Sequence, residues 1–251
     1  MSFANKVVLV TGASSGIGAA TAILFAKERA NVVLVGRNQK KLQNVLKKCD
    51  ASGSKTLVIT ADITNENDGK RIIKETIDKF GKLDVLINNA GIISFVYVAE
   101  ENVMKVYDST INTNLRAQVY LTHLAIPYLI KTKGNIVYVS SVAGTLPSVM
   151  PNLTIYSVSK AALNHFAKGV AAELAPQGVR ANIVSPGPVK TDIMNNAGVD
   201  IQLDEITFKT PLGRISDSEE VADLIVYLAS EKAKAITGSE FVCDNGFKLK
   251  F

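Results

Sequence analysis

Short apolar stretches rich in β-branched residues alternate with longer amphipathic stretches along the whole chain. The apolar stretches cover residues 7–10, 32–35, 56–60, 85–87, 136–139 and 182–184, with a weaker seventh at 241–243. Because neither face of these stretches is polar, they are typical of parallel strands covered on both sides. The amphipathic stretches predict helices at residues 17–29, 39–49, 66–80, 102–130, 156–174 and 218–229.

Alternation of strands and helices implies right-handed crossovers in a doubly wound sheet. We therefore expect an α/β fold, a Rossmann-like parallel sheet of about seven strands with helices on both faces. With 251 residues, of which 47% are hydrophobic, the chain can bury such a sheet. No linker or shift in composition divides it, so residues 1–251 are expected to form a single domain.

Composition excludes several classes of function. A net charge of +5 is modest and the lysines are dispersed, so no nucleic-acid or membrane-surface partner is indicated. No apolar stretch reaches membrane-spanning length and no signal segment precedes the first strand. Two distant cysteines favour a reducing compartment, which predicts a cytoplasmic location. His123 and His165 lack partners at ligand spacing, so no metal site is expected.

One segment, at about residues 192–211, interrupts the alternation. It is long for a connection in a compact domain, and it follows a strand end, where doubly wound sheets bind ligands. We interpret it as a lid over the substrate. A plain surface excursion is the alternative.

The first predicted strand leads into Thr11-Gly12-Ala13-Ser14-Ser15-Gly16-Ile17-Gly18 at the start of the first helix. Glycines at such a turn allow a diphosphate to approach the backbone at the helix N-terminus. The spacing differs from the common Gly-x-Gly-x2-Gly fingerprint, but its place between strand and helix predicts dinucleotide binding. A turn needed only for strand–helix packing is the alternative.

The second predicted strand ends at Val35-Gly36-Arg37-Asn38, which offers an arginine and no carboxylate. An NAD-dependent protein usually presents a carboxylate there to the ribose 2′-hydroxyl. A guanidinium pairs well with a 2′-phosphate, so the sequence favours NADP(H). Alternatively, Arg37 is a solvated loop residue and either cofactor is accepted.

Tyr156 and Lys160 are four residues apart, on one face of a predicted helix. A free phenol has a pKa of about 10, and a neighbouring positive charge lowers it towards the working range. The pair could therefore transfer a proton to or from a carbonyl or an alcohol. An exposed tyrosine–lysine pair without function has the same spacing.

The Tyr-x3-Lys motif, the glycine-rich turn and Asn88-Asn89-Ala90-Gly91 occur in an order that resembles the short-chain dehydrogenase/reductase family over essentially the whole chain. The resemblance implies cofactor contacts beyond several strand ends. These are Gly12, Ser14, Ser15, Gly16, Ile17 and Gly18; Arg37; Asp62 and Ile63 at the adenine; Asn88, Ala90 and Gly91; Tyr156 and Lys160; and Pro186, Gly187, Val189 and Thr191 at the nicotinamide.

The resemblance also implies four catalytic residues, Asn114, Ser141, Tyr156 and Lys160. Tyr156 would give its proton to the substrate carbonyl as hydride arrives from the cofactor, and Lys160 would lower its pKa and hold the nicotinamide ribose. Ser141 would bind the carbonyl oxygen, and Asn114 would hold a water that leads from Lys160 to solvent. Taken alone, Ser141 fits a turn and Asn114 a locally satisfied helix residue.

Apolar residues in the lid and between Ser141 and Tyr156 favour an apolar carbonyl substrate, such as a steroid or a 3-oxoacyl compound. They are Leu146, Val149, Met150, Leu153, Ile155, Ile193 and Met194. Phe95 and Tyr97 are expected at the pocket rim. The alternatives are a cofactor-binding regulator without turnover and an NAD-dependent alcohol dehydrogenase of the same family.

The predicted helix at residues 156–174 carries small, apolar residues on several faces, so its outer side is expected to be covered by another part of the protein or by a second subunit. Together with the helix at 102–130 it predicts a subunit interface. Relatives assemble mostly as dimers or tetramers through these helices. We therefore expect a homotetramer or homodimer.

Overall fold

A parallel seven-stranded sheet forms the centre of the computed structural model, which describes residues 3–147, 151–193 and 210–250. The strand order is β3-β2-β1-β4-β5-β6-β7, as expected for a doubly wound fold. The strands are β1 (Val7–Thr11), β2 (Asn31–Gly36), β3 (Thr56–Thr60), β4 (Val85–Asn88), β5 (Asn135–Val139), β6 (Arg180–Pro186) and β7 (Glu240–Cys243).

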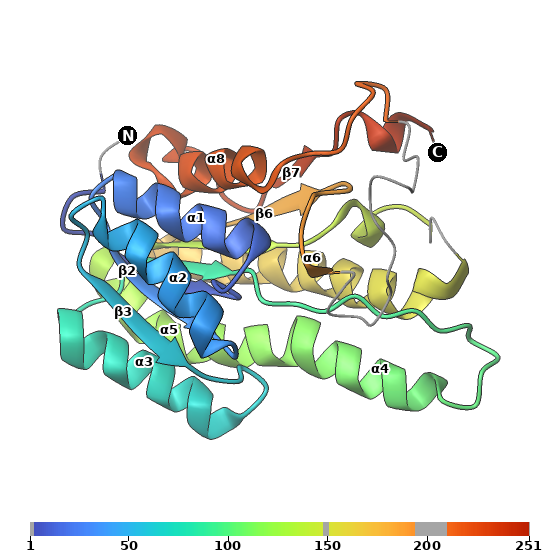
Figure 1. Ribbon diagram of the computed structural model, residues 1–251, viewed down its shortest axis with the longest axis horizontal. Coiled ribbons are helices and arrows are strands. Elements are labelled where there is room, and N and C mark those ends of the chain that lie inside the picture. Colours follow the sequence, from blue (N-terminus) through green and yellow to red (C-terminus); the bar gives the residue numbers. More distant parts are fainter. Residues whose placement is uncertain (1–2, 148–150, 194–209, 251) are drawn as a thin grey trace.

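Helices cover both faces of this sheet (Figure 1). One face is covered by α1 (Gly16–Lys27), α2 (Gln39–Asp50) and α8 (Ser218–Ala229). The opposite face is covered by α3 (Glu66–Phe80), α5 (Ala117–Thr132) and α6 (Thr154–Leu174), and α4 (Val103–Ile111) extends this layer. The α/β class and the sheet of seven strands with helices on both faces are thereby confirmed.

Alternate side chains of β1 build two separate cores. Val8 and Val10 pack among residues of α1, α2 and α8, whereas Val7 and Leu9 pack among residues of α3, α5 and α6. All four are at most 1% exposed. This period-two alternation within an apolar strand explains why the sequence shows no polar face there.

Sequence and structure differ over residues 102–130, where one continuous helix was expected. The structure instead has α4, a π-helical turn (Asn112–Arg116) and α5, which ends at Thr132. A π-helical turn contains an extra residue and shifts the faces of the flanking helices relative to each other. Hydrophobic periodicity does not reveal such a turn, because both flanking segments remain helical.

The predicted lid at about residues 192–211 lies largely outside the described residues. Asp192 and Ile193 at its beginning are described, as are Thr210 and Pro211 at its end. The remainder of the lid therefore stays a prediction from the sequence.

A buried carboxylate joins β1 to β4 at the edge of the sheet opposite the predicted site. Asp84, 3% exposed, accepts a hydrogen bond from Val7 N at 2.8 Å. Its other partners are the ammonium groups of Lys6 at 3.2 Å and Lys82 at 3.0 Å. Removal of the carboxylate leaves the Val7 amide without this acceptor.

We expect Asp84→Ala to lower the free energy of unfolding by about 1–3 kcal/mol, because a buried donor loses its partner. Urea denaturation measures the change. Asp78→Ala is the control, because it removes an exposed ion pair to Lys74 on α3 and should change stability by less than about 0.5 kcal/mol. Equal effects of the two substitutions would contradict this account of Asp84.

Candidate active site

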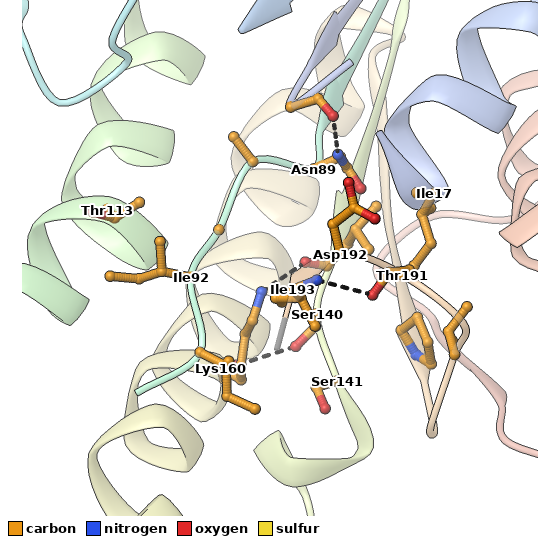
Figure 2. A pocket seen from close by; sticks show the side chains of 18 of the residues that line it. Ile17, Asn89, Ile92, Thr113, Ser140, Ser141, Lys160, Thr191, Asp192 and Ile193 are labelled. Atoms are coloured by element: carbon orange, nitrogen blue, oxygen red, sulfur yellow. Dashed lines mark hydrogen bonds between the residues drawn. The ribbon is translucent and has the colours of Figure 1, made fainter. Parts of the chain in front are cut away.

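The carboxyl ends of the strands open into a cavity of about 320 Å³. Residues at the ends of the strands and in the segments that follow β1 to β6 line it, together with Thr113 of the π-helical turn, Tyr156 and Lys160 of α6, and Phe247 of the C-terminal tail. Figure 2 shows side chains from these segments facing one another across the cavity. This is the edge at which open parallel sheets bind ligands.

The glycine-rich turn forms one wall. Gly12 and Gly16 have φ of 65° and 53°, in the left-handed region that favours glycine. A Cβ on Gly16 would lie 2.9 Å from Thr191 Cγ2, and one on Gly18 would meet the carbonyl oxygen of Gly12. Gly18 is buried behind the turn and does not line the cavity.

The beginning of α1 presents peptide N–H groups and no negative charge to this wall. Ser15 is the N-cap, its side chain makes no capping hydrogen bond, and the first turn contains no acidic residue. Helix N-termini carry a partial positive charge and bind phosphate groups. The turn therefore fits a diphosphate, with Ser14, Ser15 and Ile17 also lining the cavity.

Beyond β2, Arg37 lines the cavity and is exposed. Its neighbour Asn38 faces away and caps α2, accepting a hydrogen bond from Lys41 N at 2.9 Å. Gly36 lies against Ser14, whose Oγ would be 3.5 Å from a Cβ at that glycine. A cation and a hydroxyl thus lie at this end of the cavity, with no carboxylate contributed by the end of β2.

Asp62 and Ile63, which follow β3, also line the cavity. Asp62 Oδ1 accepts hydrogen bonds from Thr64 N at 3.0 Å and Thr64 Oγ1 at 2.8 Å. This Asx-type turn fixes the side chain at the cavity wall.

Beyond β4, the two adjacent asparagines have different surroundings. Asn88 is fully buried below the cavity and donates to Thr122 Oγ1 at 3.0 Å. Asn89 lines the cavity, and its Nδ2 donates to Thr11 O at 2.8 Å. The sequence singled out Asn88, Ala90 and Gly91 as contacts, and of these only Ala90 and Gly91 reach the cavity wall.

Tyr156 and Lys160 lie together on α6 and are 7% and 4% exposed. The Lys160 ammonium is 5.9 Å from the centroid of the Tyr156 ring and donates to Val139 O at 3.0 Å. Ser141 lies two residues beyond the end of β5. Its hydroxyl forms a hydrogen bond with the Tyr156 phenol and accepts one from Ala143 N at 3.2 Å. Figure 2 shows Lys160 and Ser141 arriving from different elements.

Burial determines the protonation of both groups. It raises the pKa of Tyr156, and the hydrogen bond to Ser141 opposes that rise. Burial also lowers the pKa of Lys160 to about 8. Burial therefore sets the direction of the Tyr156 pKa, whereas the spacing to Lys160 alone predicted a lower value. At neutral pH the phenol keeps its proton, the form needed by a proton donor.

Asn114 is fully buried in the π-helical turn and does not line the cavity. Its Oδ1 accepts from Ile92 N at 2.8 Å, and its Nδ2 donates to Ile92 O at 2.8 Å and Ser159 Oγ at 3.0 Å. A Cβ on Gly91 would be 3.2 Å from Asn114 Oδ1 and 3.5 Å from Lys160 Nζ. Asn114 Oδ1 and Lys160 Nζ therefore both lie close to Gly91.

The remaining wall is formed by the end of β6 and the segment after it. Its lining residues include Pro186, Gly187, Val189 and Thr191. A Cβ on Gly187 would lie 2.7 Å from Asp244 Cβ, so this strip packs tightly against the segment after β7.

Several lining residues were not singled out as contacts from the sequence. They are Gly36, Ala61, Thr64, Asn89, Ile92, Ile93, Thr113, Val139, Ser140, Val142, Ala143, Pro188, Asp192 and Phe247. Most are neighbours of the motifs, so proximity could have indicated them. Phe247 reaches the cavity through the fold of the tail, for which the sequence gives no local signal. Of the two aromatics expected at the rim, Phe95 lines the cavity and Tyr97 does not.

Three comparisons place this geometry among known proteins. The family model described as enoyl-(acyl carrier protein) reductase matches residues 12–248. The chain is 35% identical to 3-oxoacyl-[acyl-carrier-protein] reductase FabG of Thermotoga maritima, over 99% of this chain and 100% of that protein. It is 37% identical to glucose 1-dehydrogenase of Gluconobacter oxydans, over 98% of this chain and 93% of the relative.

Among solved structures, a short-chain dehydrogenase/reductase of unknown function from Caenorhabditis elegans, crystallised with cofactor, matches with a TM-score of 0.93. The two chains are 35% identical, and the match covers 98% of this chain and 96% of the other. The chain belongs to the short-chain dehydrogenase/reductase family of oxidoreductases, whose members use nicotinamide cofactors. In the part of the chain that the structure describes, no helix has the length and apolar character needed to cross a membrane.

The lowered pKa of Lys160 predicts a specific pH dependence of stability. The unfolded chain binds the lysine proton up to a pKa near 10.5, and the folded chain releases it near 8. Since the unfolded state holds more protons in this window, stability should rise with pH there, by up to about 1.4 kcal/mol per pH unit. Lys160→Met lacks this rise.

Urea denaturation of both proteins between pH 7 and 10 measures the difference. The wild-type free energy of unfolding should increase relative to that of Lys160→Met above about pH 8. A difference that stays constant across the range would contradict the lowered pKa of Lys160.

Proposed function

We propose that this protein is an NADP(H)-dependent oxidoreductase that reduces a ketone to a secondary alcohol, or catalyses the reverse reaction. The observation that carries the proposal is the burial of Tyr156 beside Lys160 and Ser141 in the cavity that the glycine-rich turn also lines. Burying a phenol and an ammonium costs free energy, and apolar side chains could fill the same space without this cost. A proton-transfer site explains the cost.

The walls of the cavity fit a dinucleotide. Gly12, Gly16 and the N-terminus of α1 would hold the diphosphate, because glycines let it approach the backbone and the helix N-terminus carries a partial positive charge. Asp62 would accept from the adenine amino group. Lys160 would bind the nicotinamide ribose, and the strip from Pro186 to Thr191 would lie along the nicotinamide. Bound in this place, the cofactor supplies or accepts the hydride.

The residues of the chain manage the proton. In the reduction direction, the Tyr156 hydroxyl gives its proton to the carbonyl oxygen as the carbonyl carbon gains hydride. Ser141 donates a hydrogen bond to the same oxygen and stabilises its developing negative charge. The Lys160 ammonium stabilises the tyrosinate that remains. Asn114, which lies near Gly91 as the lysine does, would hold the water through which the proton is replaced.

An apolar substrate fits the wall around Tyr156. Ala143 and Leu153 pack with Tyr156 in one cluster, against which Ile93 and Phe95 also pack. Ile193 adds a further apolar lining residue. The 3-oxoacyl substrate named for one relative is of a kind that this apolar surface could bind. A sugar, the substrate named for another relative, would need polar side chains to bind its hydroxyls.

Substitution of Tyr156 tests the reaction. We expect Tyr156→Phe to lower kcat with reactive ketones by at least about 100-fold, because the proton donor is lost. The assay follows NADPH oxidation with a panel of apolar ketones and, for comparison, sugars. If wild type and Tyr156→Phe oxidise NADPH at the same rate with every carbonyl offered, the protein is a cofactor-binding regulator without turnover and the proposal fails.

Substitution of Arg37 tests the choice of cofactor. We expect Arg37→Ala to weaken NADPH binding about tenfold and to leave NADH binding unchanged, because only NADPH carries the 2′-phosphate. Fluorescence titration measures both dissociation constants. Tighter binding of NADH than NADPH by the wild type would favour the NAD-dependent alternative.

We also propose a homotetramer or homodimer in the cytoplasm, assembled through the layer that contains α4 and α6. Met104 on α4 and Val158 on α6 are 61% and 47% exposed, although both are apolar. Cys49 and Cys243 are free thiols, which suits a reducing compartment.

Light scattering during size-exclusion chromatography tests this assembly. We expect a dimer or tetramer for the wild type and a smaller species for Val158→Glu, because a charge would enter an apolar contact. Tyr227→Glu, on α8 in the opposite layer, is the control and should leave the mass unchanged. A monomeric wild type would contradict the proposed interface.

A further inference from the structure

We propose that Asp68 and Arg71, both on α3, are positioning residues that hold the loop after β3 in the conformation that binds adenine. The inference rests on the proposed function, because it assumes that Asp62 contacts the adenine of a dinucleotide. Neither residue lines the cavity, so each would act through the loop.

Asp68 connects this loop to the helix that follows it. Its Oδ2 accepts a hydrogen bond from Asp62 N at 2.8 Å, and its Oδ1 accepts one from Arg71 Nη2 at 2.6 Å. These two hydrogen bonds keep the pKa of Asp68 below its ordinary value, so the carboxylate is charged at neutral pH. One side chain thus holds the backbone of the residue that faces the ligand.

Arg71 ties the same loop to the sheet. Its Nη2 also donates to Thr60 O, the last residue of β3, at 2.9 Å. Arg71 therefore bridges Thr60 and Asp68, the fixed points on either side of Asp62. The end of the strand, the loop and the first turn of the helix become one hydrogen-bonded unit.

An ordinary helix cap does not account for these contacts. Asn65 is the N-cap of α3, and its side chain already accepts from Asn67 N and Asp68 N. Asp68 instead reaches back beyond the cap to Asp62 N. Its acceptor serves a loop that lines the cavity rather than the end of the helix.

One oxygen of the Asp62 carboxylate is held by the loop, and the other is available to a ligand. Oδ1 is occupied by Thr64 N and Thr64 Oγ1, whereas no hydrogen bond from another described residue reaches Oδ2. The exocyclic amino group of adenine could donate a hydrogen bond to this oxygen. Because hydrogen bonds weaken steeply when misaligned, small movements of Asp62 would reduce adenine affinity.

Three ligands separate adenine binding from the other parts of the site. NADPH and NADH share the adenine, only NADPH has the 2′-phosphate, and reduced nicotinamide mononucleotide lacks the adenosine half. Fluorescence titration gives the dissociation constant of each without any knowledge of the substrate. We expect Asp68→Ala to raise the dissociation constants of NADPH and NADH by the same factor, about tenfold. The dissociation constant of the mononucleotide should rise by less than about twofold.

Two further variants control the measurement. Asp78→Asn breaks the exposed ion pair to Lys74 on the same helix and should leave all three dissociation constants unchanged. Asp68→Asn keeps an oxygen that can accept from Asp62 N and should give an intermediate loss. It also serves as the test if Asp68→Ala fails to fold, which thermal melting would show.

The outcomes distinguish the two levels of the account. Equal affinities in wild type, Asp68→Ala and Asp78→Asn would overturn the positioning role while leaving the proposed function intact; Asp68→Asn takes the place of Asp68→Ala in this comparison if the alanine variant fails to fold. So would a loss of mononucleotide affinity as large as that of NADPH, because it would indicate a general structural role. If the wild type binds neither dinucleotide, the proposed function itself fails.

Discussion

The junction between β1 and β4 determines where the cavity opens and which segments meet at its base. Strand order reverses there, so the chain leaves the two strands in opposite directions and a crevice opens between them. Thr11 closes the base of the crevice: its Oγ1 donates to Ile87 O and accepts from Asn89 N at 3.0 Å and Ala90 N at 3.1 Å. The glycine-rich turn and the 89–91 segment are thereby fixed side by side.

This arrangement positions the segment after β4 against the glycine-rich turn and α6. A Cβ on Gly12 would lie 2.7 Å from Asn89 Nδ2, so the glycine is what lets the two segments meet. Beyond them, Asn114 holds Ile92 on one side and Ser159 on the other, which connects the β4 segment to α6. Tyr156 and Lys160 are buried at that contact, and burial in turn sets the direction of both pKa shifts.

Much of this could be predicted from the sequence, for identifiable physical reasons. Apolar runs long enough for single strands revealed the sheet, and Gly12 and Gly16 revealed the turn, because glycine is favoured at positive φ. The π-helical turn at Asn114 was missed because it leaves helical periodicity intact. Phe247 was missed because only tertiary folding brings the tail to the cavity. The pKa of Tyr156 was misjudged because spacing reveals a neighbouring charge but not the extent of burial.

In the proposed function, a nicotinamide dinucleotide occupies the cavity along the carboxyl ends of β1 to β6. Hydrogen–deuterium exchange with and without saturating NADPH tests it most directly, because the readout is local and requires no substrate. With NADPH bound, we expect slower exchange in the backbone amides of residues 12–18, 61–64, 89–92 and 186–191. Unchanged exchange in these four segments, or protection confined to other surfaces, would contradict it.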